Sequence, residues 1–157
     1  MKEISYLWNG NSSLREELSK SPERISVLMF SLGFPLSVVL WHSTNSGIRI
    51  ASCMHDVGFR HGIGVLQFAM ATTPLIGEEE VDNPLSGETT LIVRKLVYRD
   101  ETVRAESGLI LSTENGREIR VVAGAMPYTL AVGGIALGHR GDEPEYDVSE
   151  YHRTEFG

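Results

Sequence analysis

The chain has 157 residues, 21 acidic and 14 basic side chains, a net charge of −7 and one cysteine, Cys53. This length predicts a single domain over 1–157, large enough to bury a core without disulfides or a metal. The lone cysteine excludes an intrachain disulfide and a zinc site made of four cysteines. The negative charge argues against sequence-independent binding of nucleic acid, which needs Lys and Arg to neutralise phosphates.

Near the N-terminus the sequence predicts a strand followed by a short helix. Residues 3–8 contain the apolar and aromatic residue types that strands favour. Ser13 and Glu16 have the spacing of a capping box, in which each side chain satisfies a free backbone N–H of the other residue. We therefore expect a helix over 13–20.

Residues 22–32 fit two different structures. Ser21 and Pro22 are residue types that begin helices. Four apolar side chains then recur at helical spacing: Ile25, Leu28, Met29 and Leu32. We expect a second helix over 22–32. Because the apolar residues between Ile25 and Met29 also alternate, a strand is the competing interpretation.

From residue 36 onward the pattern is that of a β protein. The expected strands cover 36–43, 47–53, 63–71, 89–99, 102–112, 117–125 and 128–132. Asn115-Gly116 is the strongest hairpin signal in the chain. The expected fold is therefore α+β, with N-terminal helices packed on a mainly antiparallel sheet of about seven strands, and a partly closed β-barrel is the alternative.

The negative charge is concentrated in two segments. Residues 77–88 carry five acids and no base, and residues 141–157 carry six acids and one base, so the rest of the chain is net positive. A solvated loop and a flexible, acidic C-terminal tail are the plain interpretation. The sharper interpretation is a surface that attracts a basic protein, because tyrosines that can anchor an interface are interleaved with the acids of the tail.

The residues that we predict to bind such a partner all lie in the two acidic segments: Glu78, Glu79, Glu80, Asp82, Asp142, Glu143, Glu145, Tyr146, Asp147 and Tyr151. The predicted function is a non-catalytic domain that captures and neutralises a basic protein partner, as an immunity protein or an inhibitor of a toxin does. If the toxin is a nuclease, carboxylates can occupy its substrate site as mimics of phosphates. No cofactor is expected, since no phosphate-binding or metalloprotease motif is present in the sequence.

Residues 53–61 hold the densest group of reactive side chains and support the alternative function. An enzyme or small-molecule site here would use His55, Asp56 and His61. Cys53 and His55 would share one face of a strand, but a structural zinc needs four ligands, so no metal site is predicted. A polar loop is the plainer interpretation, and we favour a protein without catalytic activity.

Two apolar stretches, 25–41 and 121–138, approach the length of a membrane span. Glycine and proline interrupt both, so each is better explained as two buried elements joined by a turn. The glycine-rich second stretch also leaves a homo-oligomeric structural protein as a further alternative. The N-terminal residues lack the apolar core of a secretory signal, so we predict a cytoplasmic protein with no membrane partner.

Overall fold

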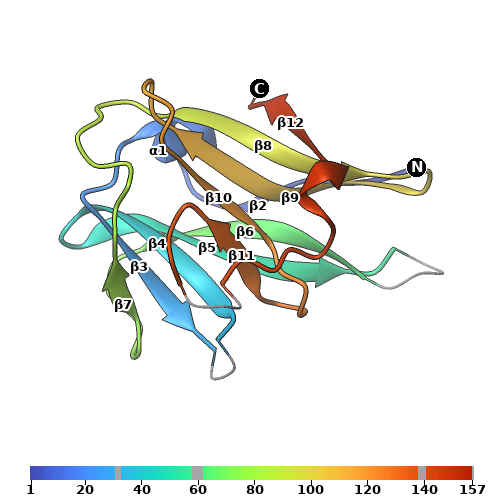
Figure 1. Cartoon of the computed structure of the whole chain (residues 1–157), viewed down its shortest axis with the longest axis horizontal. Coiled ribbons are helices and arrows are strands. Elements are labelled where there is room, and N and C mark those ends of the chain that lie inside the picture. Colours follow the sequence, from blue (N-terminus) through green and yellow to red (C-terminus); the bar gives the residue numbers. More distant parts are fainter. Residues whose placement is uncertain (31–32, 58–61, 138–140, 157) are drawn as a thin grey trace.

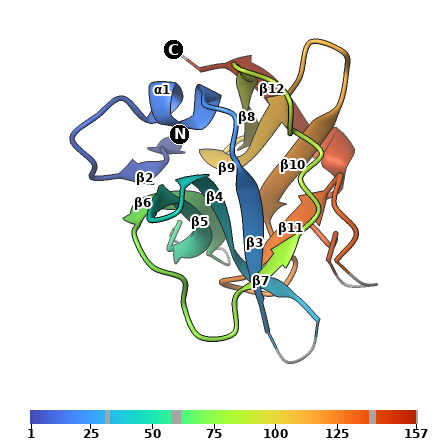
Figure 2. The same ribbon diagram turned by 90° about the vertical axis from the view of Figure 1, so that its left-hand side faces the viewer.

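The computed structural model describes residues 1–30, 33–57, 62–137 and 141–156. In this part of the chain, twelve strands form two six-stranded sheets, and helical structure is limited to one α-helix and one short 3-10 helix (Figures 1 and 2). The prediction of N-terminal helices packed on one sheet of about seven strands is therefore wrong. The protein is mostly β, with its strands shared between two layers.

The first sheet, sheet A, contains β1 (Lys2–Ile4), β8 (Ile92–Arg99), β9 (Val103–Ser112), β10 (Glu118–Ala123), β11 (Leu130–Gly133) and β12 (Tyr151–Glu155). Its order is β11-β10-β9-β8-β12, with β1 added beside β9. Sheet B contains β2 (Leu7–Trp8), β3 (Arg24–Met29), β4 (Pro35–Ser43), β5 (Ser46–His55), β6 (Ile63–Ala71) and β7 (Glu79–Val81). Its order is β2-β6-β5-β4-β3-β7. Both orders are open within the described residues, so the barrel alternative does not hold either.

The main core lies between the two sheets. Its buried apolar residues include Ile48, Ile50 and Leu66 of sheet B and Leu109 and Val121 of sheet A. Successive side chains of a strand point to opposite faces, so this alternation buries one face of each sheet against the other.

The expected helix over 13–20 is confirmed as α1 (Leu14–Ser19). The Ser13 hydroxyl accepts a hydrogen bond from the backbone N–H of Glu16 at 3.4 Å. A helix this short is not stable alone, so the burial of its two leucines in the main core holds it in place. In the described part of the chain, no helix has the length and apolar composition needed to cross a membrane.

The expected helix over 22–32 is wrong, and the competing interpretation is right. Residues 24–29 form strand β3, and residues 31–32 lie outside the described part of the chain. Ile25 and Val27 face the main core. Because β3 pairs with β4 on one side and with β7 on the other, backbone hydrogen bonds to two neighbouring strands replace those of a helix.

The strand predicted over 3–8 is divided between the two sheets. β1 lies parallel to β9 in sheet A, and β2 lies parallel to β6 in sheet B. Between them, the backbone N–H of Tyr6 donates to the Glu106 carboxylate at 2.8 Å. Nearby, β6 approaches β9, where the Ser107 hydroxyl donates to the carbonyl of Gly64 at 2.7 Å. The N-terminal segment therefore links the two sheets.

The hairpin predicted at Asn115-Gly116 is confirmed between β9 and β10. Gly116 has a positive φ of +89°, whereas the φ of Asn115 is negative. The backbone N–H of Thr113 donates to the carbonyl of Arg117 at 2.8 Å, which closes the loop. The loop is therefore longer than a two-residue turn and needs one left-handed residue rather than two.

We expect Gly116→Ala to lower the free energy of unfolding by about 1 kcal/mol, because a Cβ atom disfavours the left-handed backbone. Apart from Gly116 and its two neighbours in the chain, no described residue has an atom within 4 Å of the position that this Cβ would take, so the expected cost is backbone strain. Gly116→Asn should cost less, since asparagine tolerates this conformation. Urea unfolding measures both variants, and equal losses would contradict a backbone origin.

The acidic C-terminal segment is folded onto sheet A. It contains the 3-10 helix η1 (Val148–Glu150) and then β12, which pairs antiparallel with β8 and places Tyr151 opposite Tyr98 (Figure 1). Tyr146 stacks on Tyr98 with ring centroids 3.9 Å apart. These contacts hold the C-terminal segment against sheet A, to which it adds strand β12.

Candidate functional site

A loop crosses the outer face of sheet B between β6 and β7. Because β7 lies at the far edge of the sheet, residues 72–78 pass the intervening strands (Figure 2). Arg49 on β5 holds this loop, with its Nη2 2.7 Å from the Oε1 of Glu78. The Glu78 side chain is only 1% exposed. This predicted partner-binding residue therefore forms an ion pair within the molecule.

The loop and β7 present a surface, here called the acidic edge, made of five exposed residues: Leu75, Ile76, Glu79, Glu80 and Asp82. Ile76 is fully exposed at 102%, and Leu75 is 47% exposed. Within the described residues, the three acids form no ion pair. β7 is also an outermost strand, where charged side chains oppose edge-to-edge association of sheets. The acidic edge could therefore either bind a partner or prevent association of the sheet with another sheet.

The acids of the C-terminal segment are largely engaged within the molecule. Both carboxylate oxygens of Asp142 accept hydrogen bonds from Arg120 Nη2, at 2.6 and 2.7 Å. Glu145 accepts a hydrogen bond from the backbone N–H of Gly64 at 3.2 Å. Asp147 caps η1, and the backbone N–H that it accepts there lowers the pKa of its carboxyl. A basic partner would have to compete with these contacts.

The two tyrosines predicted to contact a partner also pack internally. Tyr146 stacks on Tyr98, and its backbone N–H donates to the hydroxyl of Tyr151 at 3.1 Å. Burial raises the pKa of Tyr151 far above its ordinary value. Glu143 is half-buried and forms no ion pair in the described part of the chain. Partner binding by this segment stays a prediction.

The reactive side chains near His55 are only partly brought together. Cys53 Sγ lies 3.5 Å from His55 Nε2 on β5. Burial raises the pKa of the Cys53 thiol, which is opposite to the shift that activates a nucleophile. The backbone carbonyl of Asp56 accepts a hydrogen bond from Lys2 Nζ, and His61 lies outside the described residues. The described residues contain no cluster of three side chains able to hold a metal.

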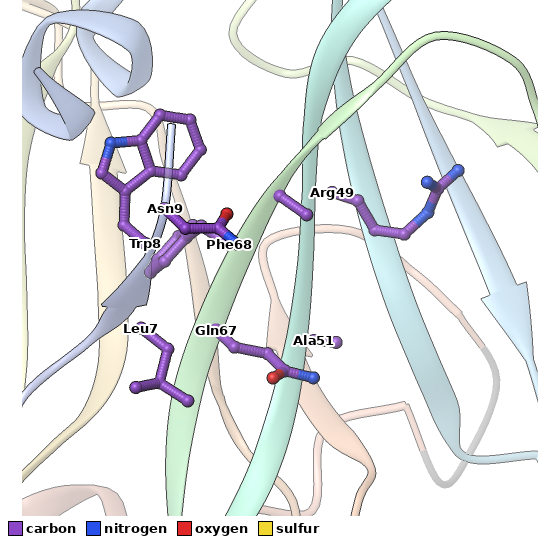
Figure 3. A pocket seen from close by; sticks show the side chains of 8 residues that line it. Leu7, Trp8, Asn9, Arg49, Ala51, Gln67 and Phe68 are labelled. Carbon is purple, nitrogen blue, oxygen red and sulfur yellow. The ribbon is translucent and has the colours of Figure 1, made fainter. Parts of the chain in front are cut away.

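The sequence did not predict a hollow on the outer face of sheet B. It has a volume of about 520 Å³ and lies over β2, β6 and β5 (Figure 3). Leu7 and Trp8 of β2 stand on one side of it. Ala51 and Ala69 line it with short side chains, which leave the space open. Two alanines at outward positions on neighbouring strands are the sequence signal that could have revealed it.

Three polar side chains line the hollow, and only one of them is charged: Asn9, Gln67 and Arg49. The Arg49 guanidinium points away from Trp8 and Gln67 (Figure 3) and is paired with Glu78. The carboxamides of Asn9 and Gln67 form no hydrogen bond with other described residues. The hollow is therefore apolar, with two free amide groups and no free charge.

A buried ion pair joins the two termini to sheet A. Lys95 Nζ lies 2.5 Å from Oε2 of Glu106, and the two side chains are 18% and 5% exposed. The same ammonium lies 5.3 Å from the ring centroid of Tyr6 and 4.8 Å from that of Phe156. Burial, reinforced by the nearby Glu106, raises the pKa of Tyr6. This cluster holds together β8, β9, the N-terminal segment and the C-terminal end.

These features differ in what they can do. The Lys95–Glu106 pair and the contacts of the C-terminal segment hold the fold together, whereas the acidic edge and the hollow are open to solvent. The two open surfaces are therefore the basis for assigning a function. Comparison of the chain with models of protein families, with curated proteins and with solved structures finds no match.

Proposed function

We propose that this protein is a non-catalytic binding protein that captures a basic protein partner through the acidic edge. The proposal is carried by the complete exposure of Ile76 in the loop that leads to three exposed acids, none of which forms an ion pair with a described residue. Carboxylates speed the encounter with a positively charged partner, and an apolar side chain adds affinity once it is buried. An inhibitor or immunity protein of a basic toxin, such as a nuclease, needs a surface of this kind.

The construction of the loop supports this proposal. The backbone N–H of Glu78 donates to the carbonyl of Leu75 at 3.1 Å, and Gly77 takes a φ of +92° in the turn. The ion pair between Arg49 and Glu78 fixes the base of this turn on the sheet. A fixed loop loses little conformational entropy on binding. Burial of Ile76 by a partner would then contribute about 1.5–3 kcal/mol.

Two variants with the same change of charge separate the acidic edge from the C-terminal segment. The edge variant carries Glu79→Gln, Glu80→Gln and Asp82→Asn. The control variant carries Glu143→Gln, Glu150→Gln and Glu155→Gln. Each is used to capture proteins from a lysate of the native host, and the captured proteins are quantified by mass spectrometry. We expect a basic protein to be retained by the natural chain and the control, and reduced at least about tenfold by the edge variant.

Kinetics with the purified partner test the mechanism. The association rate of the natural chain should fall as salt is added, because ions screen exposed charges. The edge variant should associate about tenfold more slowly at low salt and respond less to salt. Ile76→Ser should instead raise the dissociation rate. Equal capture by the edge and control variants, or loss from the control alone, would contradict the proposal.

A further inference from the structure

The hollow on sheet B has the size and lining of a small-molecule site. Its volume of about 520 Å³ lies within the usual range for such sites, about 300–1,000 Å³. Leu7 and Trp8 on β2 give it an apolar wall, whereas Phe68, on the opposite face of β6 from Gln67, packs in the main core. Ala51 and Ala69 line it with short side chains, which leaves space beside the side chain of Gln67. A ring-sized molecule can therefore remove apolar surface from water there.

The charges at the hollow are already balanced. Among the described residues of the lining, Arg49 is the only charged one, and its guanidinium donates to Glu78 through Nε at 3.3 Å and through Nη2 at 2.7 Å. None of these described lining residues is acidic. A charged molecule would lose part of its hydration without gaining a free counter-charge. The electrostatics thus favour an uncharged ligand.

Two free carboxamides can orient such a ligand. Asn9 and Gln67 each offer an N–H donor and a C=O acceptor, and neither is used by another described residue. Figure 3 shows the Gln67 side chain between Leu7 and Ala51, where it can contact a ligand in the hollow. An amide or hydroxyl group on the ligand can pair with these groups, which adds direction to the apolar contact.

We propose that the hollow binds an uncharged aromatic molecule that carries one amide or hydroxyl group. This site is separate from the acidic edge and does not depend on a protein partner. Benzamide is a suitable probe, and benzoate and benzylamine are charged molecules of similar size. For a fragment this small we expect a dissociation constant on the order of millimolar.

The two tryptophans of the chain allow binding to be measured directly. Trp8 lines the hollow, whereas Trp41 is fully buried and donates its indole N–H to Ser26. In ¹⁵N-labelled protein, benzamide should shift the Trp8 indole resonance and leave that of Trp41 unchanged. Benzoate and benzylamine should bind at least about tenfold more weakly. No shift of Trp8, or a charged probe that binds as tightly as benzamide, would overturn the proposal.

Substitutions in the hollow locate the site. Ala69→Leu should fill the space and weaken benzamide binding at least about tenfold, while Ala125→Leu, at another exposed alanine, should leave it unchanged. Gln67→Leu keeps the apolar lining and removes one carboxamide, so it should weaken binding by about three- to tenfold. An unchanged Trp41 resonance shows that each variant is folded. If Ala69→Leu binds benzamide as tightly as the natural chain does, the ligand binds elsewhere and the proposal is overturned.

Discussion

Lys95→Met is expected to lower the free energy of unfolding by about 3–5 kcal/mol, because it leaves the Glu106 carboxylate buried without its counter-charge. The two charges lie 2.5 Å apart, and the Glu106 side chain is 5% exposed. Methionine keeps the apolar stem that packs near the rings of Tyr6 and Phe156. The loss of stability therefore comes more from the missing charge than from missing packing. Urea unfolding of both proteins at neutral pH measures it.

Two further variants test whether burial is the cause. Arg94→Met breaks the exposed ion pair with Glu155, whose side chains are 34% and 80% exposed, and should cost at most about 1 kcal/mol. The double variant Lys95→Met/Glu106→Gln removes both charges and should recover a large part of the stability. The explanation fails if the double variant is less stable than Lys95→Met alone, or if Arg94→Met costs as much.

Sequence patterns predicted the structure where residues close in the chain decide it. The capping residue Ser13 begins α1, and the hairpin at Asn115-Gly116 is formed. The strands expected over 36–43 and 47–53 are present as β4 and β5. In each case the signal and the structure that it produces lie within a few residues of each other, so no distant partner is needed to interpret it.

Pairing between distant segments could not be predicted in this way. The apolar residues from Ile25 to Met29 satisfy both the helical and the strand period, and only pairing with β4 and β7 decides for a strand. β7 and β12 lie in the acidic segments, where the sequence shows no alternation of apolar and polar residues. Backbone pairing with β3 and β8 makes them strands and leaves most of their acids in solvent.

The candidate sites show the same limit. The concentration of acids was visible from composition, but the ion pair between Arg49 and Glu78 joins residues 29 positions apart. Sheet order therefore decides which acids remain free at the surface. The hollow likewise depends on strand register, which sets Ala51 opposite Gln67 and brings β2 beside β6. A single sequence without pairing information cannot supply either arrangement.

Gly64→Ala is expected to lower the free energy of unfolding by about 1–3 kcal/mol, because β6 has no room for a side chain where it meets sheet A. A Cβ atom on Gly64 would lie 2.5 Å from the Cβ of Ala123 on β10. Movement of the backbone is opposed by two hydrogen bonds of the same residue: its carbonyl accepts from Ser107 and its N–H donates to Glu145. A shift of Gly64 would therefore disturb its contacts with β9, with β10 and with the C-terminal segment.

Moving the methyl group from one strand to the other provides the decisive comparison. Ala123→Gly alone should cost about 1 kcal/mol, because glycine weakens a strand. In the double variant Gly64→Ala/Ala123→Gly, the nearest remaining atoms to the new Cβ, Oε2 of Glu145 and Cα of Ala123, lie at 3.6 and 3.8 Å, which are ordinary contacts. The double variant should therefore be more stable than Gly64→Ala, although it carries one more substitution. Additive losses in urea unfolding would show that the two strands do not meet there.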